Sequence, residues 1–332
     1  MVGVSLRSAT VRDGLAAQDF AYDLVVQGQG AKRIEVLRDV LVAPEDPGAV
    51  LEAMQEAQII SATVTEKGYH LDTGGQLNLT DPSIAADVAG QGPSTLIGLL
   101  ARHLATRSTP LTVLSCDNRT GNGAVLRAAV ARFSQAAGLK IDWAAVRFPN
   151  AMVDRITPAT TDALRRAQGD PMAVPTEPFR EWVIEDDFAG PRPVWPGVQF
   201  VADVAPHELR KLRMLNGAHS LMAYAGLVRG HTFVHEAVAD PQIRAQIGAF
   251  MDDAGRTLPV SVRDEAPAYA RALIARFENE EIRHRLEQIA MDGTQKLPYR
   301  LVAPLREGAT AAAGGIAAWL EFCAAEVARG AC

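Results

Sequence analysis

A lysine, a carboxylate, a histidine and an amide share one side of a predicted helix in the second half of the chain. At about 100° per residue, Glu208, Asn216 and His219 all fall within about 140° of Lys211. The apolar Leu215 lies on the same side, whereas an ordinary surface helix places its charged residues opposite its apolar face. This pattern indicates either a functional face or a helix between two domains.

The functional interpretation is proton transfer. A partly buried lysine can have its pKa lowered enough to act as a general base near neutral pH, and an asparagine amide can donate a hydrogen bond to a developing alkoxide. A helix that bridges two domains would carry the same residue types, with lysine and glutamate solvated and the amide and imidazole bonded to backbone groups. The residue types alone leave both interpretations open.

A second polar segment follows a predicted strand over residues 111–115 and precedes a helix that begins near Ala124. In a parallel sheet this position is the carboxyl edge, where ligands bind, and Asn118 lies in the loop. The alternative is a simple turn, in which Asp117 or Asn118 caps the helix and the glycines relieve strain.

Two further segments are polar enough to contact a hydroxylated ligand. Asp154 and Arg155 could orient such a ligand or form a surface ion pair, and Lys296 lies in a turn that could equally be a solvated loop.

The elements that must position these residues differ between the two halves of the chain. In the first half, predicted strands alternate with predicted helices, which is typical of a parallel α/β layer. The strands cover residues 22–27, 34–42, 59–65, 111–115, 143–148 and 182–184, and the helices cover 47–57 and 124–137. Gln27 to Gly30 predicts a hairpin turn between two strands.

The second half is predicted to be all-helical, because its segments are rich in Ala, Leu and Arg and nearly free of β-branched runs. These helices cover residues 206–228, 241–251, 266–277, 282–292 and 315–328. We therefore expect an α/β domain over residues 1–204 and a helical domain over 205–332, with the Pro- and Gly-rich residues 190–197 as the candidate linker.

Composition excludes several classes of protein. A chain of 332 residues buries a large core, and Lys+Arg 33 against Asp+Glu 39, net −6, makes nucleic acid an unexpected partner. No apolar run approaches the roughly 20 residues of a membrane helix, and no signal peptide is evident, so we expect a cytoplasmic protein without a membrane partner.

Neither cysteines nor histidines predict a metal site. Cys116, Cys323 and Cys332 form no C-x-x-C pair, so we expect reduced thiols and neither a disulfide framework nor structural zinc. His231 and His235 are four residues apart, but no H-E-x-x-H arrangement accompanies them, and we expect no metal.

Taken together, the segments resemble the long-chain polyol dehydrogenases, the family of mannitol 2-dehydrogenase and fructuronate reductase. The resemblance extends over almost the whole chain through ordered motifs. They are residues 3–8 (GVSLRS), 63–69 (TVTEKGY), 115–118 (SCDN), 121–123 (GNG), 148–150 (FPN), 152–156 (MVDRI), 211–219 (KLRMLNGAH) and 296–298 (KLP).

The resemblance implies a Rossmann-type domain followed by a helical domain like that of 6-phosphogluconate dehydrogenase, and an NAD- or NADP-dependent, metal-independent oxidoreductase of polyols or sugar acids. It implies a role for each site residue, as follows: Lys211 as general acid/base, Asn118 and Asn216 as amides that polarise the reacting oxygen, Glu208 as a proton relay, His219, Asp154 and Lys296 as substrate contacts, and Thr65, Glu66 and Asn118 as cofactor contacts.

One family feature is missing from the sequence. No G-x-G-x-x-G follows a predicted strand, because Gly28 and Gly30 lie in the hairpin and Gly90 and Gly92 are followed by Pro93. We expect that the glycine-rich βα unit which holds the dinucleotide pyrophosphate would precede Met1. The sequence therefore supports two hypotheses, a polyol or sugar-acid dehydrogenase and a non-catalytic remnant that binds a sugar or a protein partner.

Overall fold

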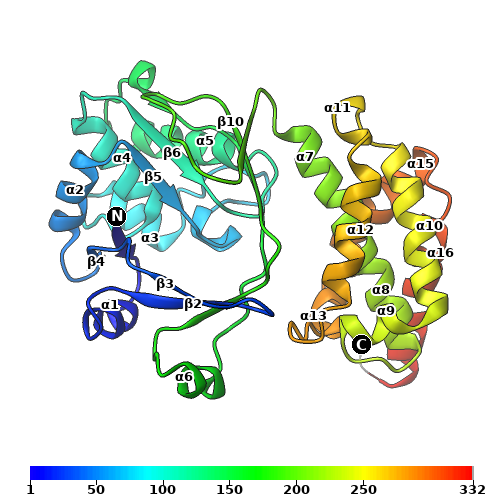
Figure 1. The fold of residues 1–332 in the computed structure, drawn as a ribbon. Coiled ribbons are helices and arrows are strands. Elements are labelled where there is room, and N and C mark those ends of the chain that lie inside the picture. The colour runs from blue at the N-terminus through cyan, green and yellow to red at the C-terminus, as the bar shows by residue number, and fades with distance from the viewer. Residues whose placement is uncertain (331–332) are drawn as a thin grey trace. The chain divides into compact units, whose positions relative to one another are not determined.

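A computed structural model describes residues 1–330, apart from the side chain of Glu66, and divides the chain into two compact units (Figure 1). The α/β unit comprises Met1–Val204 and the helical unit Ala205–Cys332. Cys116 and Cys323 are free cysteines, whereas Cys332 lies outside the described residues. Within the described residues, none of the helices combines the length and apolar character needed to cross a membrane.

Parallel strands form the centre of the α/β unit. β6 (Leu111–Ser115) is buried along its whole length and pairs in parallel with β5 (Ile59–Ala62) and β7 (Val146–Arg147). A separate parallel pair joins β1 (Val2–Ser5) to β4 (Asp39–Val42). Most residues of β6 are apolar or β-branched, which explains why it was predicted with correct bounds.

Two mixed sheets of three strands each complete the unit. β2 (Tyr22–Val26) and β3 (Gly30–Ile34) form the predicted hairpin, and β2 also pairs in parallel with β9 (Val174–Thr176). In the other sheet, β10 (Glu181–Glu185) lies between β8 (Ala151–Asp154) and β11 (Val198–Val201).

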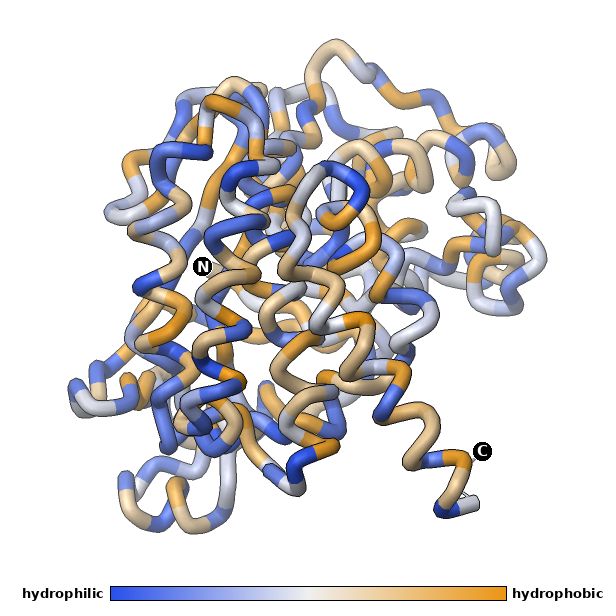
Figure 2. Tube along the Cα trace, turned by 90° about the vertical axis from the view of Figure 1, so that its right-hand side faces the viewer, coloured by the Kyte–Doolittle hydropathy of each residue, from blue (hydrophilic) through white to orange (hydrophobic). Residues whose placement is uncertain are grey.

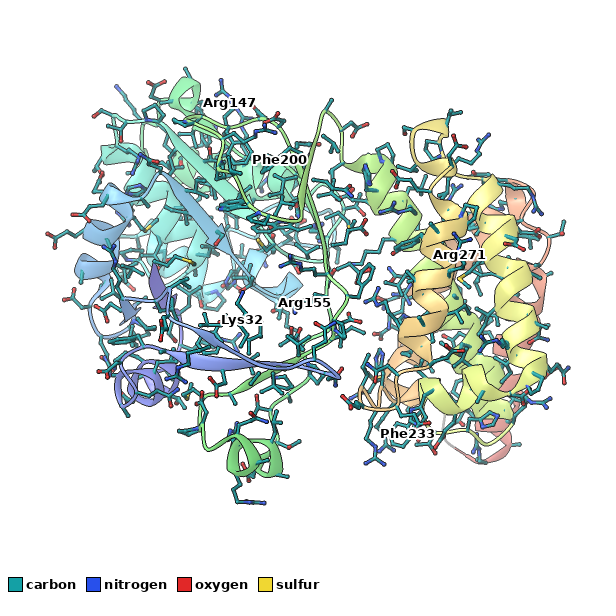
Figure 3. All side chains as sticks on the ribbon, in the orientation of Figure 1. Lys32, Arg147, Arg155, Phe200, Phe233 and Arg271 are labelled. Carbon is teal, nitrogen blue, oxygen red and sulfur yellow. The ribbon has the colours of Figure 1, made fainter. Side chains whose placement is uncertain are left out.

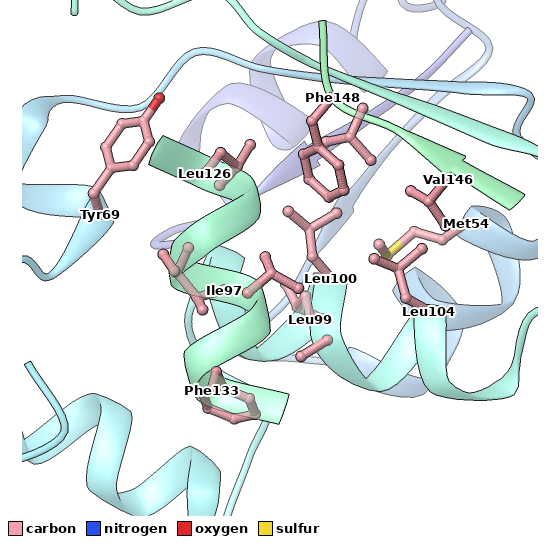
Figure 4. Close-up of a cluster of buried hydrophobic side chains, with 14 of the residues drawn as sticks. Met54, Tyr69, Ile97, Leu99, Leu100, Leu104, Leu126, Phe133, Val146 and Phe148 are labelled. Carbon is pink, nitrogen blue, oxygen red and sulfur yellow. The ribbon is translucent and has the colours of Figure 1, made fainter. Parts of the chain in front are cut away.

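Helices of the α/β unit surround a buried hydrophobic cluster (Figure 4). α4 (Leu96–Thr106) and α5 (Asn122–Ala136) contribute Ile97, Leu100 and Leu126, none of them measurably exposed. The remaining helical segments are α1 (Thr10–Ala16), α2 (Pro47–Glu56), η1 (Glu66–Tyr69), α3 (Pro82–Val88), η2 (Trp143–Ala145) and α6 (Asp162–Gln168). α2 starts as its sequence indicates, with Pro47 in the first turn and Asp46 Oδ1 accepting from Ala49 N.

Several predictions for this unit were wrong. The predicted strand over 34–42 is interrupted, because β3 ends at Ile34 in one sheet and β4 begins at Asp39 in another. The strand over 143–148 begins as a turn, since Asp142 Oδ1 accepts from Ala144 N. Residues 190–197 do not separate the units: they connect β10 to β11 inside the α/β unit.

α8 (Gly217–Val228) is the buried central helix of the helical unit. It continues from α7 (Ala205–Arg210) through the π-helix η3 (Lys211–Asn216). Other helices pack around it: α9 (Val234–Ala239), α10 (Pro241–Arg256), α11 (Val260–Arg263), α12 (Ala266–Phe277), α13 (Leu286–Ala290), α14 (Gly293–Leu297), the π-helix η4 (Pro298–Val302), α15 (Ala303–Arg306) and α16 (Ala312–Ala328). Figure 2 shows polar and apolar residues side by side along these helices, as amphipathic helices require.

Close packing around α8 depends on small residues. A Cβ at Gly217 would lie 2.5 Å from a ring atom of Phe250 and 2.9 Å from the Arg300 carbonyl oxygen. Gly217 therefore lets α10 and η4 approach the helix immediately after Asn216. α12 has the predicted bounds, whereas α13 is shorter than the predicted helix over 282–292, because Arg283 adopts a left-handed conformation with φ 44°.

Candidate active site

The predicted regular α-helix around Lys211 is wrong over six residues, because Lys211–Asn216 forms a π-helix. In a π-helix the hydrogen bonds join residues five apart, so Lys211 and Asn216 lie about one turn from each other. Asn216 therefore comes closer to the direction of Lys211 than regular α-helical geometry predicts. π-helical turns occur mostly as single turns and frequently at functional sites.

Two arginines hold this part of the helix, Arg213 within the π-helix and Arg210 at the end of α7, and α-helical spacing indicated neither of them. The Arg213 side chain is only 7% exposed, and its guanidinium donates to both Glu307 carboxylate oxygens at 2.6 and 2.7 Å. It also donates to the carbonyl and the hydroxyl of Thr257 at 2.8 Å each. Arg210 pairs with Glu265 and lies over the ring of Tyr269 at 4.5 Å. These contacts hold the backbone that carries Lys211.

His219 lies on α8, less than one turn beyond Asn216. Its ring centroid is 4.8 Å from that of Phe277 and 5.5 Å from that of His284. Burial, followed by the charges of His284, Arg276 and Arg300, lowers the pKa of His219 well below 6.5. The imidazole is therefore neutral near pH 7, and one ring nitrogen can accept a hydrogen bond from a ligand hydroxyl.

The other predicted residues of the helical unit occupy neighbouring segments. Glu208 is half-buried on α7, three residues before Lys211. Lys296 is on α14, where its Nζ donates to the Met291 carbonyl oxygen at 2.6 Å and lies 3.8 Å from Asp292 Oδ2. Lys211, Asn216 and His219 share one continuous helix, whereas Lys296 comes from a separate helix.

In the α/β unit, the predicted residues follow strand ends. Thr65 comes after β5 and Asn118 after β6, and these two strands are parallel neighbours, so both residues belong to one sheet edge. Asp154 ends β8 and is buried, whereas Asn118 is exposed. The predicted cofactor contact at Glu66 concerns a side chain outside the described residues.

Asn122, a residue for which its spacing indicates no separate role, connects the loop after β6 to the start of β8. This fully buried side chain donates to the Asp117 carbonyl oxygen at 3.0 Å and to the Ala151 carbonyl oxygen at 2.7 Å. Its Oδ1 accepts from Gly123 N at 2.8 Å and from Ala151 N at 3.0 Å. The loop with Asn118 is thereby tied to the strand that ends at Asp154.

The start of α5 tests whether a dinucleotide phosphate fits the described residues. Helix starts after parallel strands bind phosphate through free backbone amides. Here Gly123 N donates to Asn122 Oδ1 and Ala124 N donates to Asn150 Oδ1 at 3.0 Å, so side chains of the chain itself occupy these amides. A pyrophosphate therefore does not fit at this helix start. The described residues also contain no group of three or more His, Cys, Asp or Glu side chains placed to share a metal ion.

A parallel α/β unit followed by an all-helical unit places the chain among two-unit proteins of the Rossmann type. The chain belongs to the mannitol dehydrogenase family: residues 1–197 match the mannitol dehydrogenase Rossmann domain, and residues 203–330 match the mannitol dehydrogenase C-terminal domain. The resemblance stated from the motifs is confirmed, as is the fold class of a Rossmann-type domain followed by a helical domain.

Curated relatives carry oxidoreductase names. The chain is 41% identical to the D-mannonate oxidoreductase of Escherichia coli K12 over 89% of this chain and 65% of the relative. It is 37% identical to the mannitol 2-dehydrogenase of Cereibacter sphaeroides over 97% of this chain and 73% of that relative. Against several curated relatives, the chain spans only 57% to 65% of their length.

Solved structures share the fold. A D-sorbitol dehydrogenase in substrate-free form matches with a TM-score of 0.88 and 32% identity, over 97% of this chain and 73% of that chain. The Pseudomonas fluorescens mannitol 2-dehydrogenase, solved in a ternary complex with NAD and D-mannitol, matches with a TM-score of 0.82 and 36% identity, over 97% and 72% of the two chains.

Proposed function

We propose that this chain carries the proton-transfer and substrate-binding residues of an NAD(P)-dependent oxidoreductase that interconverts a polyol or a sugar acid with its keto form. The observation that carries the proposal is the helix on which Lys211 and Asn216 stand about one π-helical turn apart, followed by the neutral imidazole of His219. Family membership and the names of the relatives support the same reaction class.

In this proposal, each residue handles a proton or a hydrogen bond. Neutral Lys211 accepts the substrate hydroxyl proton as an alkoxide develops, and the amides of Asn216 and Asn118 donate hydrogen bonds to that oxygen. Glu208, one turn before Lys211, passes the proton on toward solvent. When bound, the nicotinamide supplies the hydride acceptor for the substrate carbon.

The remaining assignments belong to the same proposal. His219, Asp154 and Lys296 bind substrate hydroxyls, and Thr65, Glu66 and Asn118 contact the dinucleotide, which is NAD or NADP. We also propose a cytoplasmic protein whose partner is this small-molecule substrate.

Replacement of Lys211 tests the proposal. We expect Lys211→Ala to lower kcat by about 10³-fold, since a positioned general base contributes about 10² to 10⁴. The assay follows NAD(P)H formation with mannitol, arabinitol and mannonate, and NAD(P)H oxidation with fructose and fructuronate. Lys140→Ala, which changes an exposed lysine of the other unit, is the matched control and should keep the wild-type rate.

An active Lys211→Ala variant would contradict the role of this lysine. A folded wild-type chain that neither turns over these substrates nor binds NADH in calorimetric titration would instead favour the non-catalytic remnant.

A further inference from the structure

Arg300 is a half-buried cation of the helical unit that the proposed reaction does not use. Its Nη1 donates to the Ser220 hydroxyl at 3.1 Å, and within the described residues this is the only hydrogen-bond partner of its side chain. No carboxylate of that part of the chain pairs with it. Burial lowers the pKa of Arg300, and the interaction with Tyr224 partly opposes this shift. In most proteins, a buried cationic side chain is paired with an acidic one.

The position of Arg300 links it to the candidate site. Arg300 lies four residues after Lys296 on the continuous helix formed by α14 and η4, so the two cations are about one turn apart. Its partner Ser220 is four residues after Asn216, and its charge acts on His219. The guanidinium therefore lies at Ser220, about one turn of α8 beyond the proposed site residue Asn216.

The surroundings of Arg300 provide neutral or basic groups. His219 is neutral, and burial also lowers the pKa of His284. The Tyr224 hydroxyl donates to the Ala290 carbonyl oxygen, and its pKa is raised to about 12, mainly by burial, so it stays protonated. Asp292, an acid whose charge acts on Tyr224, is exposed and lies beside Lys296. An anionic ligand group at Arg300 would meet no buried negative charge among these side chains.

Contacts with Phe233 and Val234 hold residues 283–285, which include His284, in place. The guanidinium groups of Arg283 and Arg285 lie 5.2 and 5.9 Å from the ring centroid of Phe233, the side chain labelled in Figure 3. Val234 N also donates to the His284 carbonyl oxygen at 3.0 Å. His284 therefore keeps its place against His219, which makes this a preformed surface rather than a mobile loop.

A guanidinium with unused donors matches a carboxylate, because its planar fork can donate two parallel hydrogen bonds to the two oxygens. We propose that Arg300 binds the carboxylate of a sugar-acid substrate, so that the chain prefers sugar acids to neutral polyols. The inference rests on the proposed function, since Lys296 and His219 bind the substrate hydroxyls while Arg300 binds the terminal carboxylate.

Paired substrates test the inference. Arg300→Met should lower kcat/KM for mannonate by about 30-fold, the effect of losing charge-assisted hydrogen bonds, and mostly through KM because the carboxylate is remote from the reacting carbon. The loss with mannitol should be at least about ten times smaller, since a neutral polyol lacks the carboxylate. Arg300→Lys should recover part of the mannonate activity. Arg244→Met, which removes an arginine paired with Glu278 in the same unit, should change neither.

Equal losses with both substrates, or a wild-type preference for mannitol, would overturn the inference while the proposed function stands. If the wild-type chain oxidises neither substrate, calorimetry with mannonate and mannitol decides the matter. Mannonate binding that Arg300→Met abolishes would support the inference even though the proposed function has failed. No mannonate binding by the wild-type chain would overturn it.

Discussion

The two units hold their candidate site residues by different chemistry. In the α/β unit, the neutral amide of Asn122 makes four hydrogen bonds that join the loop after β6 to the start of β8, and it is completely buried. In the helical unit, the ion pair between Arg213 and the half-exposed Glu307 fixes the π-helix. A buried amide network responds little to salt, whereas a partly exposed ion pair is screened by it. The contacts that position site residues should therefore depend little on salt concentration in the α/β unit and more strongly on it in the helical unit.

Removal of the amide should have the largest effect. Asn122→Ala leaves two carbonyl oxygens and two amide groups without their partner in the interior, so we expect the free energy of unfolding of the α/β unit to fall by about 4 kcal/mol. Urea unfolding monitored by circular dichroism measures this change. Asn78→Ala, which removes hydrogen bonds of a half-buried turn to Thr80, is the control and should cost about 1 kcal/mol or less. Equal effects of the two variants would contradict the role of Asn122.

Acid should weaken the α/β unit through His103, a residue of α4 that is 1% exposed. Burial, with the charge of Arg107 second, lowers the pKa of His103 to about 4. In the unfolded chain, His103 takes up a proton below about pH 6.5, whereas in the folded chain it does so only near pH 4. The contribution of neutral His103 to the free energy of unfolding is therefore fully present above about pH 6.5. It should fall by about 3 kcal/mol as the pH decreases through this window.

His103→Gln isolates this contribution, because glutamine does not titrate. Urea unfolding of both proteins between pH 4 and 7 should show a smaller pH dependence in the variant. Identical slopes would show that His103 does not bind the extra proton in the unfolded chain.

The smallest of the three expected effects comes from comparing two ion pairs of the helical unit, Arg213 with Glu307 and Arg244 with Glu278. Glu307→Gln should lower the free energy of unfolding by about 2 kcal/mol, because buried Arg213 loses its counter-charge. Glu278→Gln should cost under about 1 kcal/mol, since both members of its pair with Arg244 are half-exposed.

These two glutamates are matched, with 49% and 47% of their side chains exposed. Thermal unfolding in low and high salt compares them, and the difference between wild type and Glu307→Gln should shrink in high salt. A larger loss from Glu278→Gln would mean that burial of the arginine does not determine the strength of the pair.

Sequence reasoning worked best where a local signal and tertiary structure agree. The hairpin at Gly28 and Gly30 was predicted correctly because these glycines adopt the positive φ that the turn needs. β6 was predicted correctly because most of its residues are apolar or β-branched, which favours a strand. α4 was not predicted, because most of its residues are apolar and a short buried apolar run does not distinguish a helix from a strand.

The site was predictable in its residue types but not in its geometry. The side chains on the Lys211 helix were selected by α-helical spacing, yet a π-helix leaves no periodic signal in a sequence window. Arg213 and Asn122 act through partners that are far away in the chain, Glu307 and Ala151, and spacing within one helix or loop carries no information about them.

The π-helix also bears on the number of residues in this turn. Its hydrogen bonds join residues five apart rather than four apart, so Lys211–Asn216 contains one residue more than an α-helix needs to reach the same rotation. α8 therefore leaves the turn in nearly the same rotational register as it would after an α-helix one residue shorter, and the buried Tyr224 stays in the interior. An extra residue, which usually requires a surface loop, is accommodated here inside a packed helix.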